Sequence, residues 1–251
     1  MESVTSGNES VLGRLLEEIS WEGSTVRRYR DGGQGLENVL TAEVVTALDF
    51  LPRQAFLGAV LDRAHGADEA RRLLSGEVED AELTFLPEEI TLNPDRRARG
   101  ERLIVQPDAF VITPSCAALV EAKRIRSSSF QPQQLAREYL AVTRGANGRK
   151  PLLLVVLGTP PPVLLAGEGR MTVHDAVARH LPVVHGLASA HPVPLDDLTA
   201  RIDEVCAWIT WAELVDVVVE QQGRLAVADP SVAASIGRLV ASVVRSVARH
   251  S

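Results

Sequence analysis

The sequence predicts a mixed α/β fold, in which a central mixed sheet is flanked by helices. Three observations predict it: an apolar helical repeat over residues 36–51, strand-like runs between residues 81 and 125, and a fully apolar run at 152–157 that follows another helical pattern. A chain of 251 residues is long enough to bury a sheet of this kind. We expect a single domain over residues 1–251, with its core at 36–157 and extra C-terminal helices over 158–251.

Helical patterns dominate the beginning of the chain. Residues 11–19 carry leucines on one face, and residues 25–29 have the composition of an edge strand. In residues 36–51 apolar side chains recur at every third or fourth position, and Pro52 ends the pattern. Residues 56–74 are predicted as a second helical segment.

Three strand-like segments come next. Residues 81–93 alternate between apolar and polar side chains, with an interruption at Pro87. Residues 103–113 are rich in β-formers but contain Pro107, and proline inside a strand indicates an edge or a bulge. Residues 117–125 form the third strand. Two of these segments carry the polar residues discussed below.

The second half begins with a helix at residues 132–144, which has proline in its first turn, and continues with the buried strand at 152–157. Residues 195–219 are predicted to be helical, with a short strand at 208–211. Residues 231–249 form a long amphipathic helix. Its apolar stripe, which includes Ile236 and Val240, is either core or a dimer surface.

Composition limits the classes of function. The net charge of −7 argues against a nonspecific nucleic-acid coat, although a local basic patch is compatible with it. Two cysteines are too few for a disulfide framework or a zinc cluster. The polar first ten residues are unlike a signal peptide, and apolar runs such as 152–157 are too short to span a bilayer. We therefore expect a cytoplasmic protein with no membrane partner.

Lys123 is unusual, because the chain contains 24 Arg and only two Lys. A position that requires lysine needs a compact ammonium, which guanidinium cannot replace. Residues i and i+2 of a strand face the same way, so Glu121 and Lys123 share a face. If the neighbouring strand brings Asp108 beside Glu121, the two carboxylates favour a hard divalent cation such as Mg²⁺ or Mn²⁺. A nearby lysine can then orient or deprotonate a water molecule.

This arrangement resembles a known motif. Pro107-Asp108, twelve intervening residues and Glu121-Ala122-Lys123 are similar to the PD-(D/E)xK motif of the restriction-endonuclease-like nuclease superfamily. The resemblance implies a helix, a three-stranded antiparallel unit that carries the motif, a helix and a further strand, which agrees with residues 36–157. It also implies that Asp108, Glu121 and the Ala122 carbonyl bind the metal, and that Lys123 serves the nucleophilic water.

The resemblance suggests further site residues. Some members have a metal-binding Glu on the first helix, and Glu37 is the best match, with Glu43 as the rival. Others have a QxxxY pair after the lysine strand. Here Gln134 and Tyr139 are five residues apart instead of four, so only Gln134 is expected at the site. Residues 158–251 have no counterpart in the motif.

Basic residues near the motif in sequence are candidates for contact with a phosphate backbone. They are Arg97, Arg99, Arg124 and Arg126. A solvated surface is the alternative explanation for each of these arginines. The resemblance as a whole implies a Mg²⁺-dependent enzyme that hydrolyses DNA, in restriction, phage defence or repair, alone, as a homodimer or with a defence-complex partner.

Other interpretations remain open at this point. Glu121 and Lys123 are also compatible with the solvated face of an edge strand, Asp108 with a turn cap after Pro107, and Glu37 with a first-turn acid that interacts with the helix dipole. For function, the main alternative is a catalytically inactive subunit on the same scaffold that binds nucleic acid or a partner protein. Cleavage of RNA is a third hypothesis.

Overall fold

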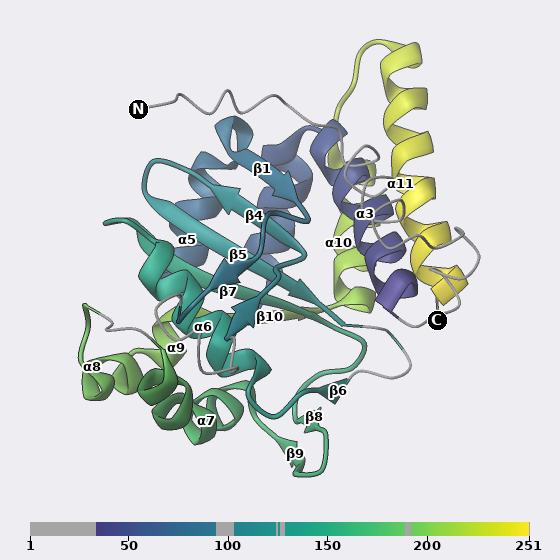
Figure 1. Ribbon diagram of the computed structural model, residues 1–251. Coiled ribbons are helices and arrows are strands. Elements are labelled where there is room, and N and C mark those ends of the chain that lie inside the picture. Colours follow the sequence, from purple (N-terminus) through teal and green to yellow (C-terminus); the bar gives the residue numbers. More distant parts are fainter. Residues whose placement is uncertain (1–33, 94–102, 124, 126–128, 189–191, 251) are drawn as a thin grey trace.

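The computed structural model describes residues 34–93, 103–123, 125, 129–188 and 192–250 (Figure 1). The side chains of residues 34–38 are also outside this description. The elements expected at residues 11–19 and 25–29 therefore lie outside the described residues. Within the described part, the chain forms a mixed α/β fold whose central sheet is flanked by helices.

The central sheet is mixed. Its strand order is β1 (Glu82–Phe85), β4 (Ala109–Ile112), β5 (Cys116–Ala122), β7 (Lys150–Leu157) and β10 (Cys206–Thr210). The first three strands pair antiparallel, and β5, β7 and β10 pair parallel. Strand β7, predicted from its unbroken apolar run, is buried at seven of its eight residues and lies between two partners. This confirms the central position expected for it.

Helices cover both faces of the sheet (Figure 1). On one face lie α3 (Gln34–Phe50), the π-helical turn η1 (Gln54–Gly58), α4 (Ala59–Arg63), α5 (Asp68–Glu77), α10 (Trp211–Arg224) and α11 (Pro230–His250). On the other lie α6 (Gln134–Gly145), α7 (Val173–Leu187), α8 (Leu195–Ala200) and α9 (Ile202–Val205). Strand β5 supplies Val120 and Ala122 to the first core and Leu119 to the second, so the two faces alternate along it.

Short elements complete the fold. A 3₁₀ turn, η2 (Val78–Asp80), precedes β1, and β2 (Ile90–Thr91) pairs with β3 (Ile104–Val105) in a separate two-stranded sheet. Strands β6 (Ser129–Phe130), β8 (Val163–Leu165) and β9 (Gly169–Met171) form a third sheet. The region 158–194, for which the sequence predicts no element, therefore begins with a small sheet and continues with α7.

The predicted helical segment 56–74 is interrupted. Gly66 and Ala67 both have positive φ, at 80° and 47°, and separate α4 from α5. A β-carbon on Gly66 would lie 2.5 Å from the Cys206 carbonyl oxygen, so this close approach to β10 requires glycine. Helical periodicity continues on both sides of the break and does not reveal it.

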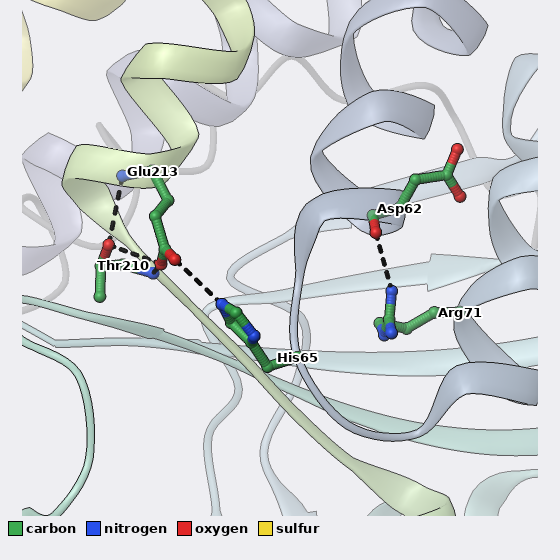
Figure 2. A network of polar contacts seen from close by, with 5 residues as sticks. All are labelled: Asp62, His65, Arg71, Thr210 and Glu213. Atoms are coloured by element: carbon green, nitrogen blue, oxygen red, sulfur yellow. Dashed lines mark hydrogen bonds and ion pairs between the residues drawn. The ribbon is translucent and has the colours of Figure 1, made fainter.

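This interruption covers the free edge of β10. His65 and Trp208 exchange backbone hydrogen bonds of 2.8 and 2.9 Å, and their rings stack with centroids 4.1 Å apart. The His65 Nε2 also lies 2.9 Å from Glu213 Oε1, and Glu213 closes a capping box with Thr210 at the start of α10 (Figure 2). The turn thus pairs with the part of the edge strand that would otherwise be open to another chain.

A buried arginine holds the same turn from the other side. The Arg71 guanidinium donates to the Asp62 carbonyl oxygen at 3.2 Å (Figure 2). It also donates to the Leu61 carbonyl oxygen at 2.7 Å and to the Gly66 carbonyl oxygen. These carbonyls belong to the end of α4 and the turn that follows it. Arg71 therefore satisfies helix-end acceptors that would otherwise be buried without a donor.

Pro107 divides the strand predicted over residues 103–113. Strand β3 ends at Val105, β4 begins at Ala109, and the two belong to different sheets. The expectation of an edge strand is wrong for the motif-bearing half, because β4 lies between β1 and β5. Proline cannot donate to a sheet ladder, so pairing stops there and resumes immediately after Asp108.

Helix α11 confirms the predicted C-terminal helix. Its buried residues Ile236, Val240 and Val243 belong to the core shared with α3 and α10, so the apolar stripe is core. By length and composition α11 could also cross a membrane, and only 28% of its most apolar window is buried. Among the described residues one bent helix pair meets the same test, Val39–Phe50 with Gln54–Arg63.

Candidate active site

Asp108 lies beside the end of β5. The β4–β5 register pairs Ala109 with Val120, and the Asp108 backbone N–H continues the ladder by donating to the Val120 carbonyl at 3.1 Å. The Asp108 Oδ2 accepts a hydrogen bond of 2.6 Å from the Ala122 N–H. Its side chain thus binds the neighbouring strand, which argues against the interpretation of Asp108 as simply a turn cap. Asp108 is 8% exposed.

Glu121 and Lys123 share the sheet face that α6 covers. The Lys123 backbone N–H donates to the Val156 carbonyl at 2.8 Å, which extends the β5–β7 ladder to this residue. The Lys123 ammonium donates to Glu121 Oε1 at 2.5 Å and lies 5.1 Å from the Phe130 ring centroid. Glu121 and Lys123 are 4% and 9% exposed, and β5 is an interior strand. The interpretation as a solvated edge-strand face is therefore wrong.

Gln134 reaches the same carboxylate from the first turn of α6. Its Nε2 donates to Glu121 Oε1 at 2.6 Å. Tyr139, the residue that the imperfect QxxxY match would bring in, has its hydroxyl directed elsewhere and donates to the Leu198 carbonyl at 2.5 Å. The structure thus places Asp108, Glu121, Lys123 and Gln134 around the end of β5 and leaves Tyr139 in the helical core.

Glu138 is a fifth residue at this site, and the sequence analysis missed it. Its side chain is 3% exposed and belongs to the buried face of α6. Burial is the main cause that raises the pKa of Glu138 well above its ordinary value, and the negative charge of Glu121 is the second. The positive charge of Lys123 and a hydrogen bond from Gln134 act in the opposite direction. The available signal was a glutamate four residues after Gln134, on a helix face that is otherwise apolar.

The other predicted site residues either lie outside the described part of the chain or are placed elsewhere in the fold. The side chain of Glu37 and the residues Arg97, Arg99, Arg124 and Arg126 lie outside the described residues. The rival Glu43 lies on α3, which packs on the opposite face of the sheet, and it faces Arg249 of α11 at 3.6 Å. Glu43 is therefore engaged with the C-terminal helix.

The end of β5 is held from the opposite face as well. The Trp211 indole N–H donates to the Lys123 carbonyl at 2.7 Å, and the ring is almost fully buried. Trp211 opens α10, so this helix and α6 hold the same short piece of strand from two sides. Trp211 belongs to the hydrophobic core on this face of the sheet.

The oxygen atoms at this site are ligands of the type that a hard cation prefers. The site offers carboxylate oxygens, and one of them, the buried Glu138 Oε2, has no hydrogen-bond partner. In this arrangement Lys123 and Gln134 both bind Glu121 Oε1. Over the described part of the chain, no three His, Cys, Asp or Glu side chains are close enough to hold a metal ion. Cation binding would therefore require Glu121 to exchange its present contacts.

No family model, curated protein or solved structure matches this chain. The argument for function therefore rests on the side chains themselves. Acidic, cationic and amide groups are buried together at the end of two antiparallel strands, where polar groups are retained at a cost in stability. Clusters of this kind concentrate at functional sites.

Proposed function

We propose that this chain is a Mg²⁺-dependent nuclease of the PD-(D/E)xK class that hydrolyses phosphodiester bonds in DNA. The observation that carries the proposal is the buried convergence of Asp108, Glu121 and Lys123 at one end of the β4–β5 pair. In the sequence, Asp108 is separated from Glu121 and Lys123 by the length of one β-hairpin. They are the three side chains that the motif requires.

The order of elements also supports the proposal. Helix α3 precedes the antiparallel strands β1, β4 and β5, and α6 and the parallel strand β7 follow. This is the sequence of elements that the resemblance implies for a restriction-endonuclease-like core. The helices α7 to α11 and strand β10 would then be an elaboration that extends the sheet beyond β7.

The residues have distinct roles in the proposed reaction. Asp108, Glu121 and the Ala122 carbonyl would hold Mg²⁺ or Mn²⁺, which when bound activates water and polarises the phosphoryl oxygen. Lys123 would orient the attacking water and stabilise charge that develops on the phosphate. Gln134 holds the Glu121 carboxylate in position through its amide, so it acts as a positioning residue.

The direct test is cleavage of plasmid and linear DNA by the full chain with Mg²⁺ or Mn²⁺. Asp108→Ala and Lys123→Ala are expected to reduce the rate by about 10²-fold or more, because each removes charge stabilisation from the reacting groups. Lys150→Ala is the matched control, since Lys150 is the only other lysine and pairs at the surface with Glu69. Cleavage that survives both site substitutions would refute the proposal. A parallel assay with RNA separates the two substrates.

A second candidate function is a catalytically inactive subunit on the same scaffold, which binds nucleic acid or a partner protein. The observation in its favour is that Glu121 Oε1 already accepts from Lys123 and Gln134, an arrangement that satisfies the carboxylate without metal. Calorimetry with Mn²⁺ distinguishes the two functions. An enzyme should show a binding site that Glu121→Ala removes, whereas an inactive subunit should show none.

A further inference from the structure

Glu138 contains a buried acceptor that the fold does not satisfy. The residue lies on α6, one turn after Gln134, and its side chain is 3% exposed. Its Oε2 atom is buried and has no hydrogen-bond partner. Leaving a buried polar atom unpaired costs about 1–3 kcal/mol, and more for a charged group. The other buried residues of α6 are apolar apart from this one, so packing alone does not explain a glutamate here.

The surroundings of Glu138 are those of the candidate active site. Gln134 bonds Glu121 and also hydrogen-bonds the Glu138 carboxyl, so it links the two acids. The charges of Glu121, Lys123 and Asp108 all act on Glu138. Asp108 and Glu121 come from the β4–β5 pair, and Glu138 adds a third carboxyl group from α6, the helix that covers this face of the sheet.

Three acids near one another repel, and the present cations offset this only in part. Lys123 donates to Glu121, and its positive charge also acts on Glu138. A divalent cation bound by oxygen atoms would provide a partner for the unsatisfied Oε2 and would reduce the repulsion among the carboxylates. It would also explain why a helix face packed against a sheet keeps an acid at this position.

We propose that Glu138 is a further carboxylate ligand of the divalent cation at this site. This inference rests on the proposed function. It assigns the acid that a helix contributes to Glu138 of α6, whereas the sequence suggested Glu37 of α3. The ligands Asp108 and Glu121 reach the cation from the sheet, and Glu138 reaches it from the helix that covers them. Their approach requires movement of side chains, because the acidic groups are not yet close enough to hold a metal.

The test measures Mn²⁺ binding to the full chain by calorimetry and, independently, the rise in Tm that Mn²⁺ produces. Glu138→Gln keeps the shape of the side chain and removes its charge, and Glu138→Leu serves as a second variant that suits an apolar environment. Glu82→Gln is the matched control, since Glu82 is exposed on β1. Each Glu138 variant is expected to weaken Mn²⁺ binding by about tenfold or more and to reduce the Mn²⁺-dependent rise in Tm, while Glu82→Gln changes neither.

The outcomes separate this inference from the proposed function. If the wild type binds Mn²⁺, Glu121→Gln weakens binding and either Glu138 variant binds as tightly as the wild type, then Glu138 is not a ligand and the proposed function stands. If the wild type shows no Mn²⁺ binding, both the inference and the proposed metal-dependent function are overturned. A purely structural role for Glu138 would alter Tm equally with and without Mn²⁺, and that result also overturns the inference.

Discussion

Replacing Glu138 with glutamine should change how the stability of the metal-free protein depends on pH. Burial and the neighbouring Glu121 raise the pKa of Glu138 well above 4.5, its ordinary value, so the folded chain holds this proton more tightly than the unfolded chain. The stabilisation is fully present below the unfolded pKa and is lost as pH rises through the folded pKa. Between these two values the wild type loses about 1.4 kcal/mol of unfolding free energy per pH unit.

Glutamine at position 138 does not titrate, so the variant should escape this loss. As pH rises above the ordinary pKa of a glutamate, the difference in unfolding free energy should therefore shift in favour of Glu138→Gln. Urea denaturation in the presence of EDTA, at about pH 5, 6 and 7, measures this difference directly. Because both proteins share every other titrating group, the comparison isolates position 138.

The control for this experiment is Glu82→Gln, which removes an exposed carboxylate from β1. This substitution leaves the buried cluster around Glu138 unchanged, so a flat difference from the wild type is expected over the same pH range. A Glu138→Gln difference that is equally flat would show that Glu138 is ionised in the folded protein. That result would refute the electrostatic description of the site.

Three further substitutions test the packing around the site, each by urea denaturation. Lys123→Met should lower the free energy of unfolding by about 3 kcal/mol, because it leaves the buried Glu121 without its cation, and adding Glu121→Gln should recover part of the loss; no recovery would mean that the two residues are not coupled. Trp211→Phe should cost about 2 kcal/mol through the lost hydrogen bond to the Lys123 carbonyl, and a neutral result would argue against that bond. Thr41→Val should stabilise the protein by about 1 kcal/mol, since its buried hydroxyl has no partner and lines an apolar cavity of about 60 Å³; a loss of stability would indicate an unseen partner.

The main elements were predictable because their periodicity reflects burial. The helical repeat that ends near Pro52, the apolar strand β7 and the amphipathic α11 each bury one side or all of their surface, and local pattern records this directly. The break between α4 and α5 was not predictable in the same way. It depends on the approach of Gly66 to a β10 carbonyl that lies far away in the sequence.

The candidate site was predictable to the extent that strand geometry determines it. Alternation places Glu121 and Lys123 on one face, and a hairpin brings Asp108 beside them. Glu138 was missed because a single acid in an amphipathic helix usually faces solvent, and its burial appears only when α6 is packed on the sheet. The predictions for Glu37 and the four arginines stay predictions, since these side chains lie outside the described residues.

By itself the sequence determined the order of the main helices and strands over residues 36–157 and the shared face of Glu121 and Lys123, because both follow from the local periods of the backbone. Only the tertiary structure decided that β4 and β5 are interior strands, that Gln134 binds Glu121, and that Glu138 is buried with one oxygen unsatisfied. Burial and hydrogen bonding depend on contacts between segments that are distant along the chain, and local pattern does not encode which segments meet.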